Sequence, residues 1–218
     1  MQRDANLIIP GISDLDLASK RFTVAVDLGF SRSRKTNGIA FGYPDGSLDT
    51  LETKFGDLAD VLIDILDNSA DQQANIVLEA PLYFTFDSRG NPIGRVKGER
   101  KVVGGKTNTR YWYLSGGARV AWSAYFMLNE LLAAKLKKKT DIYLYEGFIS
   151  YKKSGTPHHE DAERLIRALA CGRAGMVVDG KTQDELREPI TGAVDRRFIL
   201  EPSQQVDYGE SVPTIIFA

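Results

Sequence analysis

The first third of the chain carries short runs in which apolar residues recur at every second position. In "TVAVDLGF", residues 23–30, Val24 and Val26 occupy alternate positions before an acid, Asp27. A second run, "NGIAFGYPDG", ends in a Pro-Asp-Gly turn, and "SLDTLETKF" forms a third run directly after it. The period of two and the intervening turn predict three strands joined in antiparallel order by short connections.

A helical period follows. In "GDLADVLIDILDN", Leu58, Leu62 and Ile65 or Leu66 recur on one side of a predicted helix, and "ANIVLEAPL" then reads as a short buried strand. The longest helix is predicted in "GGARVAWSAYFMLNELLAAKLKKK", with its lysines at the C-terminal end, where the helix dipole favours cations. Its apolar stripe is expected to consist of Val120 or Ala121, Tyr125, Leu128, Leu132 and Leu136.

The second half of the chain predicts one further strand, "DIYLYEGF", and one further helix, "TPHHEDAERLIRALACG". Thr156 is the expected N-cap of that helix and Pro157 its first residue. Residues 83–113 show no clean period and contain many glycines and basic residues, which predicts a long loop. Residues 1–20 receive no assignment, and the last forty residues offer only two short apolar runs, "RFILEP" and "PTIIFA".

This order of elements predicts an α/β fold. The expected architecture is a mixed β-sheet, with three antiparallel strands followed by parallel strands, flanked by helices on both faces. The 218 residues suit a single domain, residues 1–218, with an insertion at about 83–115 and a C-terminal extension from about residue 174.

Composition narrows the classes of function. The net charge of −1 means that any polyanion must be bound by a local patch rather than by the whole molecule. A single cysteine, Cys171, excludes a disulfide framework and a thiolate zinc site. The start "MQRDANLIIP" does not resemble a signal peptide, and no run approaches the ~20 apolar residues of a membrane span. We therefore expect a cytoplasmic protein that has no membrane partner.

Three acids stand at the ends of predicted elements. Asp27 closes the first strand, Glu79 closes the buried strand, and Asp161 lies in the first turns of the last helix, three residues after His158. Residues three apart share a helix face, and the carboxyl ends of neighbouring parallel strands meet at one edge of a sheet. Carboxylates gathered there repel one another unless a divalent cation neutralises them, and an oxygen-rich set favours Mg²⁺ or Mn²⁺ over zinc.

The same motifs resemble the RNase H-like superfamily, and within it the RuvC-type resolvase branch. That branch carries an Asp on the first strand, a Glu ending the fourth strand and a His/Asp-x-x-Asp-Ala motif on a late helix. "AVDLG", "VLEAPL" and "HHEDA" are the corresponding segments here. The chain is also similar to predicted RNase H-like nucleases of unknown function that share "IDAPL"-like and "YEVYP"-like segments, for which "LEAPL" and "YEGF" (with Glu146) are the counterparts.

The resemblance implies hydrolysis of phosphodiester bonds by two metal ions, Mg²⁺ or Mn²⁺. Asp27 is then expected to bridge the ions, while Glu79 and Asp161 each hold one of them. His158 is expected to ligate a metal ion or to carry a proton near neutral pH. Glu160 is a spare ligand that a small rotation of the helix would bring in.

Basic and aromatic residues indicate a nucleic-acid partner, DNA or RNA, because cations follow phosphates and aromatic rings stack on unpaired bases. Near Asp27, the loop after the first strand carries Arg32, Arg34 and Lys35. The long loop carries Arg95, Lys97, Arg100, Lys101, Lys106 and Arg110, followed by Tyr111, Trp112 and Tyr113.

Other interpretations stay open. Acids are common at strand ends and at the first turn of helices, where the dipole favours them. "DLGFSRSRKTNGIAFG" also resembles the phosphate loop of ATP-binding phosphotransferases of the actin-like and sugar-kinase group. A third alternative is a catalytically inactive RNase H-like scaffold that binds nucleic acid. The sequence does not distinguish a monomer from a homodimer.

Overall fold

The computed structural model of the chain describes most of its first half and shorter segments of its second half. The described residues are 7–12, 14–86, 100–103, 106–109, 116–134, 136–137, 140–149, 155–171, 175–178, 186–189 and 214–217. The predicted strand at "RFILEP", residues 197–202, lies outside them.

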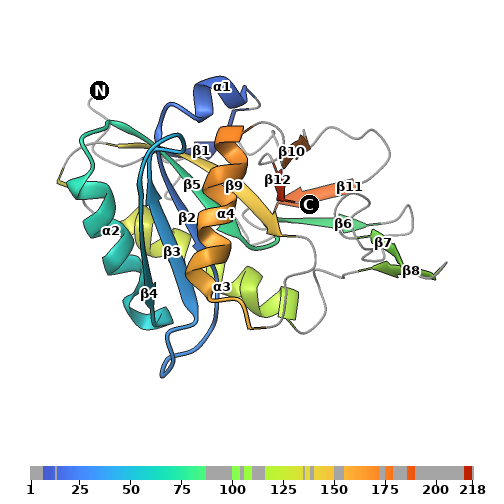
Figure 1. Ribbon diagram of the computed structural model, residues 1–218. Coiled ribbons are helices and arrows are strands. Elements are labelled where there is room, and N and C mark those ends of the chain that lie inside the picture. Colours follow the sequence, from blue (N-terminus) through green and yellow to red (C-terminus); the bar gives the residue numbers. More distant parts are fainter. Residues whose placement is uncertain are drawn as a thin grey trace.

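A mixed eight-stranded sheet forms the centre of the molecule (Figure 1). Seven strands follow the order β10-β12-β9-β5-β2-β3-β4, and β1 also pairs with β9. The strands are β1 (Leu7–Pro10), β2 (Phe22–Asp27), β3 (Asn37–Gly42), β4 (Leu48–Thr53), β5 (Gln73–Glu79), β9 (Asp141–Ile149), β10 (Gly175–Val178) and β12 (Thr214–Phe217).

The strand directions confirm the predicted α/β class. β2, β3 and β4 form an antiparallel meander, and β5 and β9 then continue the sheet in parallel beyond β2. The turn between β3 and β4 is closed by the Gly46 N–H, which donates to the Tyr43 carbonyl at 2.9 Å. The Pro-Asp-Gly signal therefore marks the turn that the sequence predicted.

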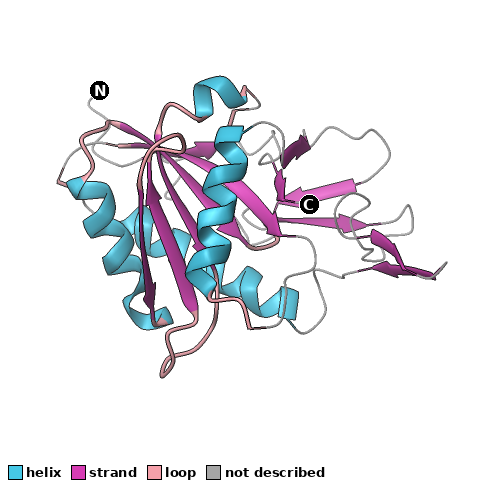
Figure 2. Ribbon diagram, in the orientation of Figure 1, coloured by secondary structure: helices cyan, strands magenta, loops and turns pink. Residues whose placement is uncertain are grey.

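Helices cover both faces of the sheet (Figure 2). They are α1 (Leu15–Ala18), α2 (Leu58–Asn68), α3 (Gly116–Ala133) and α4 (His158–Cys171), with a short 3₁₀ turn, η1 (Phe55–Asp57), before α2. α4 crosses one face, where Ala18 of α1 joins its core, while α2 and α3 lie on the other (Figure 1). The buried side of α2 consists of the predicted Leu58, Leu62, Ile65 and Leu66.

Alternation along β2 decides which face receives Asp27. Val24 and Val26 belong to the core beneath α2 and α3, whereas Ala25 belongs to the core beneath α4. Since side chains alternate along a strand, Asp27 points to the same side as Ala25, towards α4. By the same alternation, Glu79 points to the same side as Val77, which also belongs to the α4 core.

Several expectations were incomplete or wrong. Within the predicted long loop lie three four-residue strands, β6 (Tyr83–Phe86), β7 (Arg100–Val103) and β8 (Lys106–Thr109), which are too short to show a period. β7 pairs with β8, and β6 pairs with β11 (Leu186–Pro189) of the C-terminal extension. The same extension supplies β10 and β12 to the central sheet.

The predicted length of the long helix was also wrong, because α3 ends at Ala133, before the lysines. Leu136 lies after the helix but still packs against the core. No helix among the described residues is both long and apolar enough to cross a membrane.

Candidate metal centre

Two of the three acids are neighbours across adjacent parallel strands. Asp27 is the last residue of β2 and stands in register with Glu79, the last residue of β5. The chain turns sharply at Glu79, since the Ala80 N–H donates to the Leu78 carbonyl at 2.8 Å. Both carboxylates therefore leave the same edge of the sheet on the side that faces α4.

Glycine at position 38 lets α4 approach this edge closely. Gly38 stands in register with Asp27 on the other side of β2. A Cβ atom added there would lie 2.0–2.3 Å from the backbone of His158 and His159, the first residues of α4. Further along, a Cβ on Gly147 of β9 would meet the Leu165 side chain at 2.8 Å. The absence of side chains at these two positions thus allows the first turn of α4 to lie against the strand ends.

The third acid completes the group from α4. Asp27, Glu79 and Asp161 each place one carboxylate oxygen within 4.8 Å of the other two. Asp27 and Asp161 are buried, and Glu79 is partly buried. The predicted convergence of these three acids is confirmed. Metal binding by them stays a prediction.

The donor set suits a hard divalent cation. Two oxygens bound to one Mg²⁺ at about 2.1 Å lie at most about 4.2 Å apart, so small side-chain rotations would close this group around an ion. Carboxylate oxygens are the ligands that Mg²⁺ and Mn²⁺ prefer. Three acids this close also repel one another, which a cation would relieve.

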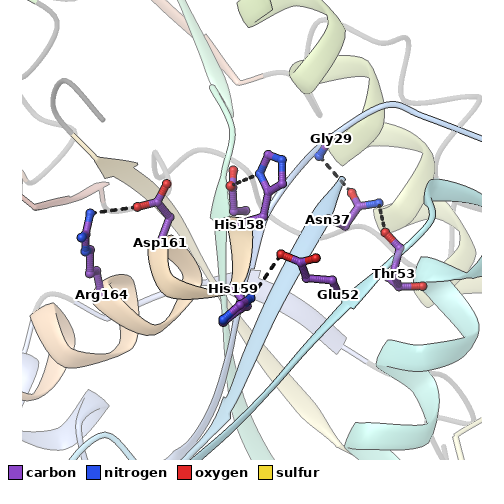
Figure 3. A network of polar contacts seen from close by, with 9 residues as sticks. Gly29, Asn37, Glu52, Thr53, His158, His159, Asp161 and Arg164 are labelled. Carbon is purple, nitrogen blue, oxygen red and sulfur yellow. Dashed lines mark hydrogen bonds and ion pairs between the residues drawn. The ribbon is translucent and has the colours of Figure 1, made fainter. Parts of the chain in front are cut away.

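Two basic side chains hold acids of this group in place (Figure 3). His158 Nδ1 lies 2.6 Å from Asp27 Oδ2, and the imidazole remains 43% exposed. Arg164 Nη1 donates to Asp161 Oδ1 at 3.1 Å from one turn further along α4. The structure therefore brings the predicted His158 to the acids and adds Arg164, which was not predicted. An acid and an arginine three apart on a helix were the available signal.

Two other residues of the first turn of α4 point elsewhere. Glu160, the predicted spare ligand, is exposed and lies outside the group of three carboxylates. His159 Nδ1 lies 3.2 Å from Glu52 Oε1 on β4, so this imidazole contacts the meander rather than the acids (Figure 3).

A buried asparagine fixes the chain just after Asp27. Asn37 Oδ1 accepts a hydrogen bond from the Gly29 N–H at 2.9 Å, and Asn37 Nδ2 donates to the Thr53 carbonyl at 3.2 Å (Figure 3). A Cβ on Gly29 would lie 2.3 Å from Thr36, which explains the glycine at this position. Asn37 was not among the predicted residues, although a polar residue at the start of an apolar strand is a usable signal.

Glu146 likewise fixes the chain just after Glu79. It follows Tyr145 on β9 and points to the opposite face, where its Oε2 accepts the Leu82 N–H at 2.8 Å. Its side chain is buried. Glu146 thus holds the segment that leaves β5 and is separate from the three clustered acids.

The predicted nucleic-acid contacts are only partly visible. Arg32, Arg34 and Lys35 are exposed in the loop that follows β2, on the chain that leaves Asp27. Arg100 and Lys101 lie on β7 and Lys106 on β8, but their side chains are outside the described part of the chain. The remaining predicted contacts, Arg95, Lys97, Arg110, Tyr111 and Trp112, also lie outside the described residues.

Comparison with known proteins adds no assignment to this geometry. No protein-family model matches the chain, and no curated protein sequence matches it.

Proposed function

We propose that the chain is a metal-dependent nuclease that hydrolyses phosphodiester bonds of DNA or RNA with two metal ions, Mg²⁺ or Mn²⁺. The observation that carries the proposal is the convergence of Asp27, Glu79 and Asp161 within 4.8 Å at the end of a parallel strand pair. In open α/β sheets, this edge is where sites are built.

The arrangement of elements supports an RNase H-like assignment within the same proposal. Asp27 ends the first strand of the meander, and Glu79 ends the fourth strand in the series β2 to β5. Asp161 and His158 come from a later helix, α4. This is the order of acids that the resemblance to RuvC-type resolvases implies.

The chain's own residues have distinct roles in the proposed reaction. Asp27, Glu79 and Asp161 would hold the metal ions, which when bound supply an activated water and stabilise the leaving oxygen. His158 orients Asp27 through Nδ1, and its half-exposed ring is able to exchange a proton with water. Arg164 orients Asp161 and offsets part of the negative charge. Arg32, Arg34 and Lys35 supply positive charge for the phosphates near Asp27.

The first prediction concerns metal affinity, which calorimetric titration with Mn²⁺ measures directly. Asp27→Asn and Glu79→Gln keep the shape of the side chains but remove charge from the group. We expect each to weaken Mn²⁺ binding by at least about tenfold, since even residues that only support a ligand account for about 10–100-fold. Asp64→Asn, on the exposed side of α2, is the matched control and should bind Mn²⁺ like the unmodified chain.

Cleavage assays separate the proposal from its alternatives. Asp27→Asn should abolish Mn²⁺-dependent cleavage of a labelled nucleic acid while its binding persists. A thermal shift with ATP and Mg²⁺ that nucleic acid does not produce would instead favour the phosphotransferase. Mn²⁺ titrations without binding, together with absent cleavage, would leave only the inactive scaffold.

A further inference from the structure

Three aromatic side chains form a cluster on α3. The Trp122 ring centroid lies 5.7 Å from that of Tyr125 and 5.9 Å from that of Phe126, and the last two lie 5.6 Å apart. Trp122 is 55% exposed and Phe126 46%. Single exposed apolar residues are ordinary, whereas a contiguous group of them indicates a binding surface. We call Trp122, Tyr125 and Phe126 the α3 platform.

Packing of the helix does not require the exposed rings of this platform. The core side of α3 is already formed by other positions, namely Ala121, Ala124, Met127, Leu128 and Leu131, all of which are buried. Trp122 and Phe126 stand outside that set on the solvent side. Their exposure costs solvation free energy that a polar residue at the same positions would avoid.

The platform adjoins the chain that leaves the candidate metal centre. Ser123 Oγ donates to the Gly29 carbonyl at 3.1 Å, and Gly29 is two residues beyond Asp27. Figure 3 shows Gly29 beside α3. The next residue, Phe30, is 52% exposed and stacks edge-on against Phe55 with the centroids 4.7 Å apart. Exposed rings therefore flank this hydrogen bond on both segments.

Cations accompany these rings. Arg119 is exposed three residues before Trp122, and therefore on the same side of the helix. Beyond Phe30 come the exposed side chains of Arg32, Arg34 and Lys35. The exposed acid on this side of α3, Glu130, lies towards the opposite end of the helix. Aromatic faces with cations beside them are what unpaired nucleotides require, because bases stack on the rings and phosphates meet the charges.

We propose that the α3 platform, together with Arg119 and the 32–35 loop, binds unpaired nucleotides and leads that strand to the three acids. The destination of the strand rests on the proposed nuclease function, but binding at the platform needs no metal. The substrate class is then a nucleic acid with an unpaired stretch, such as a single strand, a flap or a loop. A continuous duplex is excluded from stacking because its base faces are covered by neighbouring base pairs.

Anisotropy measurements in EDTA test binding apart from cleavage. The probes are a fluorescein-labelled oligothymidine and a labelled duplex of equal length. The unmodified chain should prefer the single strand. Trp122→Ala and Phe126→Ala should each weaken single-strand binding by about 5- to 100-fold, with little effect on the duplex. Arg119→Gln should lower the salt dependence of binding, and Glu130→Ala is the matched control that should not weaken it.

Tryptophan fluorescence gives an independent measurement. The chain has two tryptophans, so Trp122 is the only one left in Trp112→Phe. Oligothymidine should quench its emission, and a constant emission during saturating binding would overturn the proposal. Unchanged single-strand binding by Trp122→Ala would also overturn the proposal. This holds even if gel filtration shows that the exposed ring serves self-association of the chain instead. If the unmodified chain cleaves nucleic acid but the platform variants bind it normally, the platform proposal alone is refuted. If the platform binds single strands but no cleavage is observed, the nuclease proposal alone is refuted.

Discussion

The two faces of the central sheet are packed in different ways. The face beneath α2 and α3 presents large branched side chains, among them Val24, Val26, Ile39, Ile76 and Leu78. On the face beneath α4, β2 and β3 present small residues, with Ala25 and Ala40 in the core and Gly38 against the helix, while Gly147 of β9 lies against Leu165. The larger residues of this face, Val77, Tyr145 and Ile149, lie on β5 and β9. The glycines at positions 38 and 147 thus allow α4 to lie close to the strands, whereas large side chains stand between the sheet and the helices of the other face.

The close approach of α4 to the strands matters because an aspartate side chain is short. Asp161 reaches Asp27 and Glu79 only from a helix whose backbone lies against the strand ends. The α2 and α3 face, with larger side chains between helix and sheet, supplies stability and presents its aromatic residues to solvent. The glycines of the α4 face therefore explain how Asp161 comes within reach of Asp27 and Glu79.

The strongest test of this difference is Gly38→Ala. A Cβ at position 38 would lie 2.0 Å from the His158 backbone, and a helix backbone cannot move aside locally. We expect α4 to be displaced, Mn²⁺ binding to be lost in calorimetric titrations, and the free energy of unfolding to fall by about 3 kcal/mol in urea.

Gly56→Ala is the matched control, since nothing lies within 4 Å of a Cβ at that position. It should leave both metal affinity and stability close to those of the unmodified chain. Normal Mn²⁺ affinity in Gly38→Ala would show that the close approach of α4 is not what assembles the acids.

Two core truncations, one on each face of the sheet, are expected to cause similar losses of stability and so allow the faces to be compared. Leu165 on α4 and Leu62 on α2 are both fully buried, so Leu165→Ala and Leu62→Ala should each lower the free energy of unfolding by about 2–5 kcal/mol. Only Leu165→Ala loosens the helix that carries Asp161. We therefore expect it to weaken Mn²⁺ binding by roughly tenfold, on the scale of lost supporting contacts. Equal effects of the two variants on Mn²⁺ affinity would show that packing of the α4 face is no more important for the acids than packing of the other face.

The acids of this site were predictable because each stands at a visible boundary. Asp27 and Glu79 end apolar runs, and Asp161 opens a helix whose apolar spacing is clear, so their order along the chain already suggested a common edge. The meander was predictable for the same reason, since its turn and its alternation agree. Gly38 was not, because a glycine within a strand looks like an interruption until the helix above it is known.

The aromatic side of α3 was missed because the helical period is ambiguous there. Most positions between 120 and 128 are apolar, so the sequence permits several stripes. The predicted stripe used Tyr125, which is only half-buried, whereas the buried side relies on small residues such as Ala121 and Ala124. Alanines contribute little to a hydrophobic pattern yet pack closely against a sheet, so the larger aromatic residues misled the assignment.

The smallest expected effect concerns Tyr145, a buried residue of the α4 face. Its hydroxyl donates to the Ile12 carbonyl at 3.2 Å and accepts the Ile12 N–H at 3.0 Å, which ties the N-terminal segment to β9. Tyr145→Phe leaves both backbone groups without this partner and should lower the free energy of unfolding by about 1–3 kcal/mol. Metal affinity should not change, because the hydroxyl is hydrogen-bonded to the Ile12 backbone and is not part of the group of three acids.

The same variant has a pH signature. Burial raises the pKa of the Tyr145 hydroxyl above its usual value of 10.0, so the unfolded chain releases this proton first as the pH rises. The stabilisation is therefore complete below pH 10 and is lost as the pH rises through the folded-state pKa. In urea titrations the unmodified chain should exceed Tyr145→Phe in stability at neutral pH, and the difference should narrow above pH 10. A difference that stays constant or widens above pH 10 would mean that the pKa of this hydroxyl is not higher in the folded state than in the unfolded state.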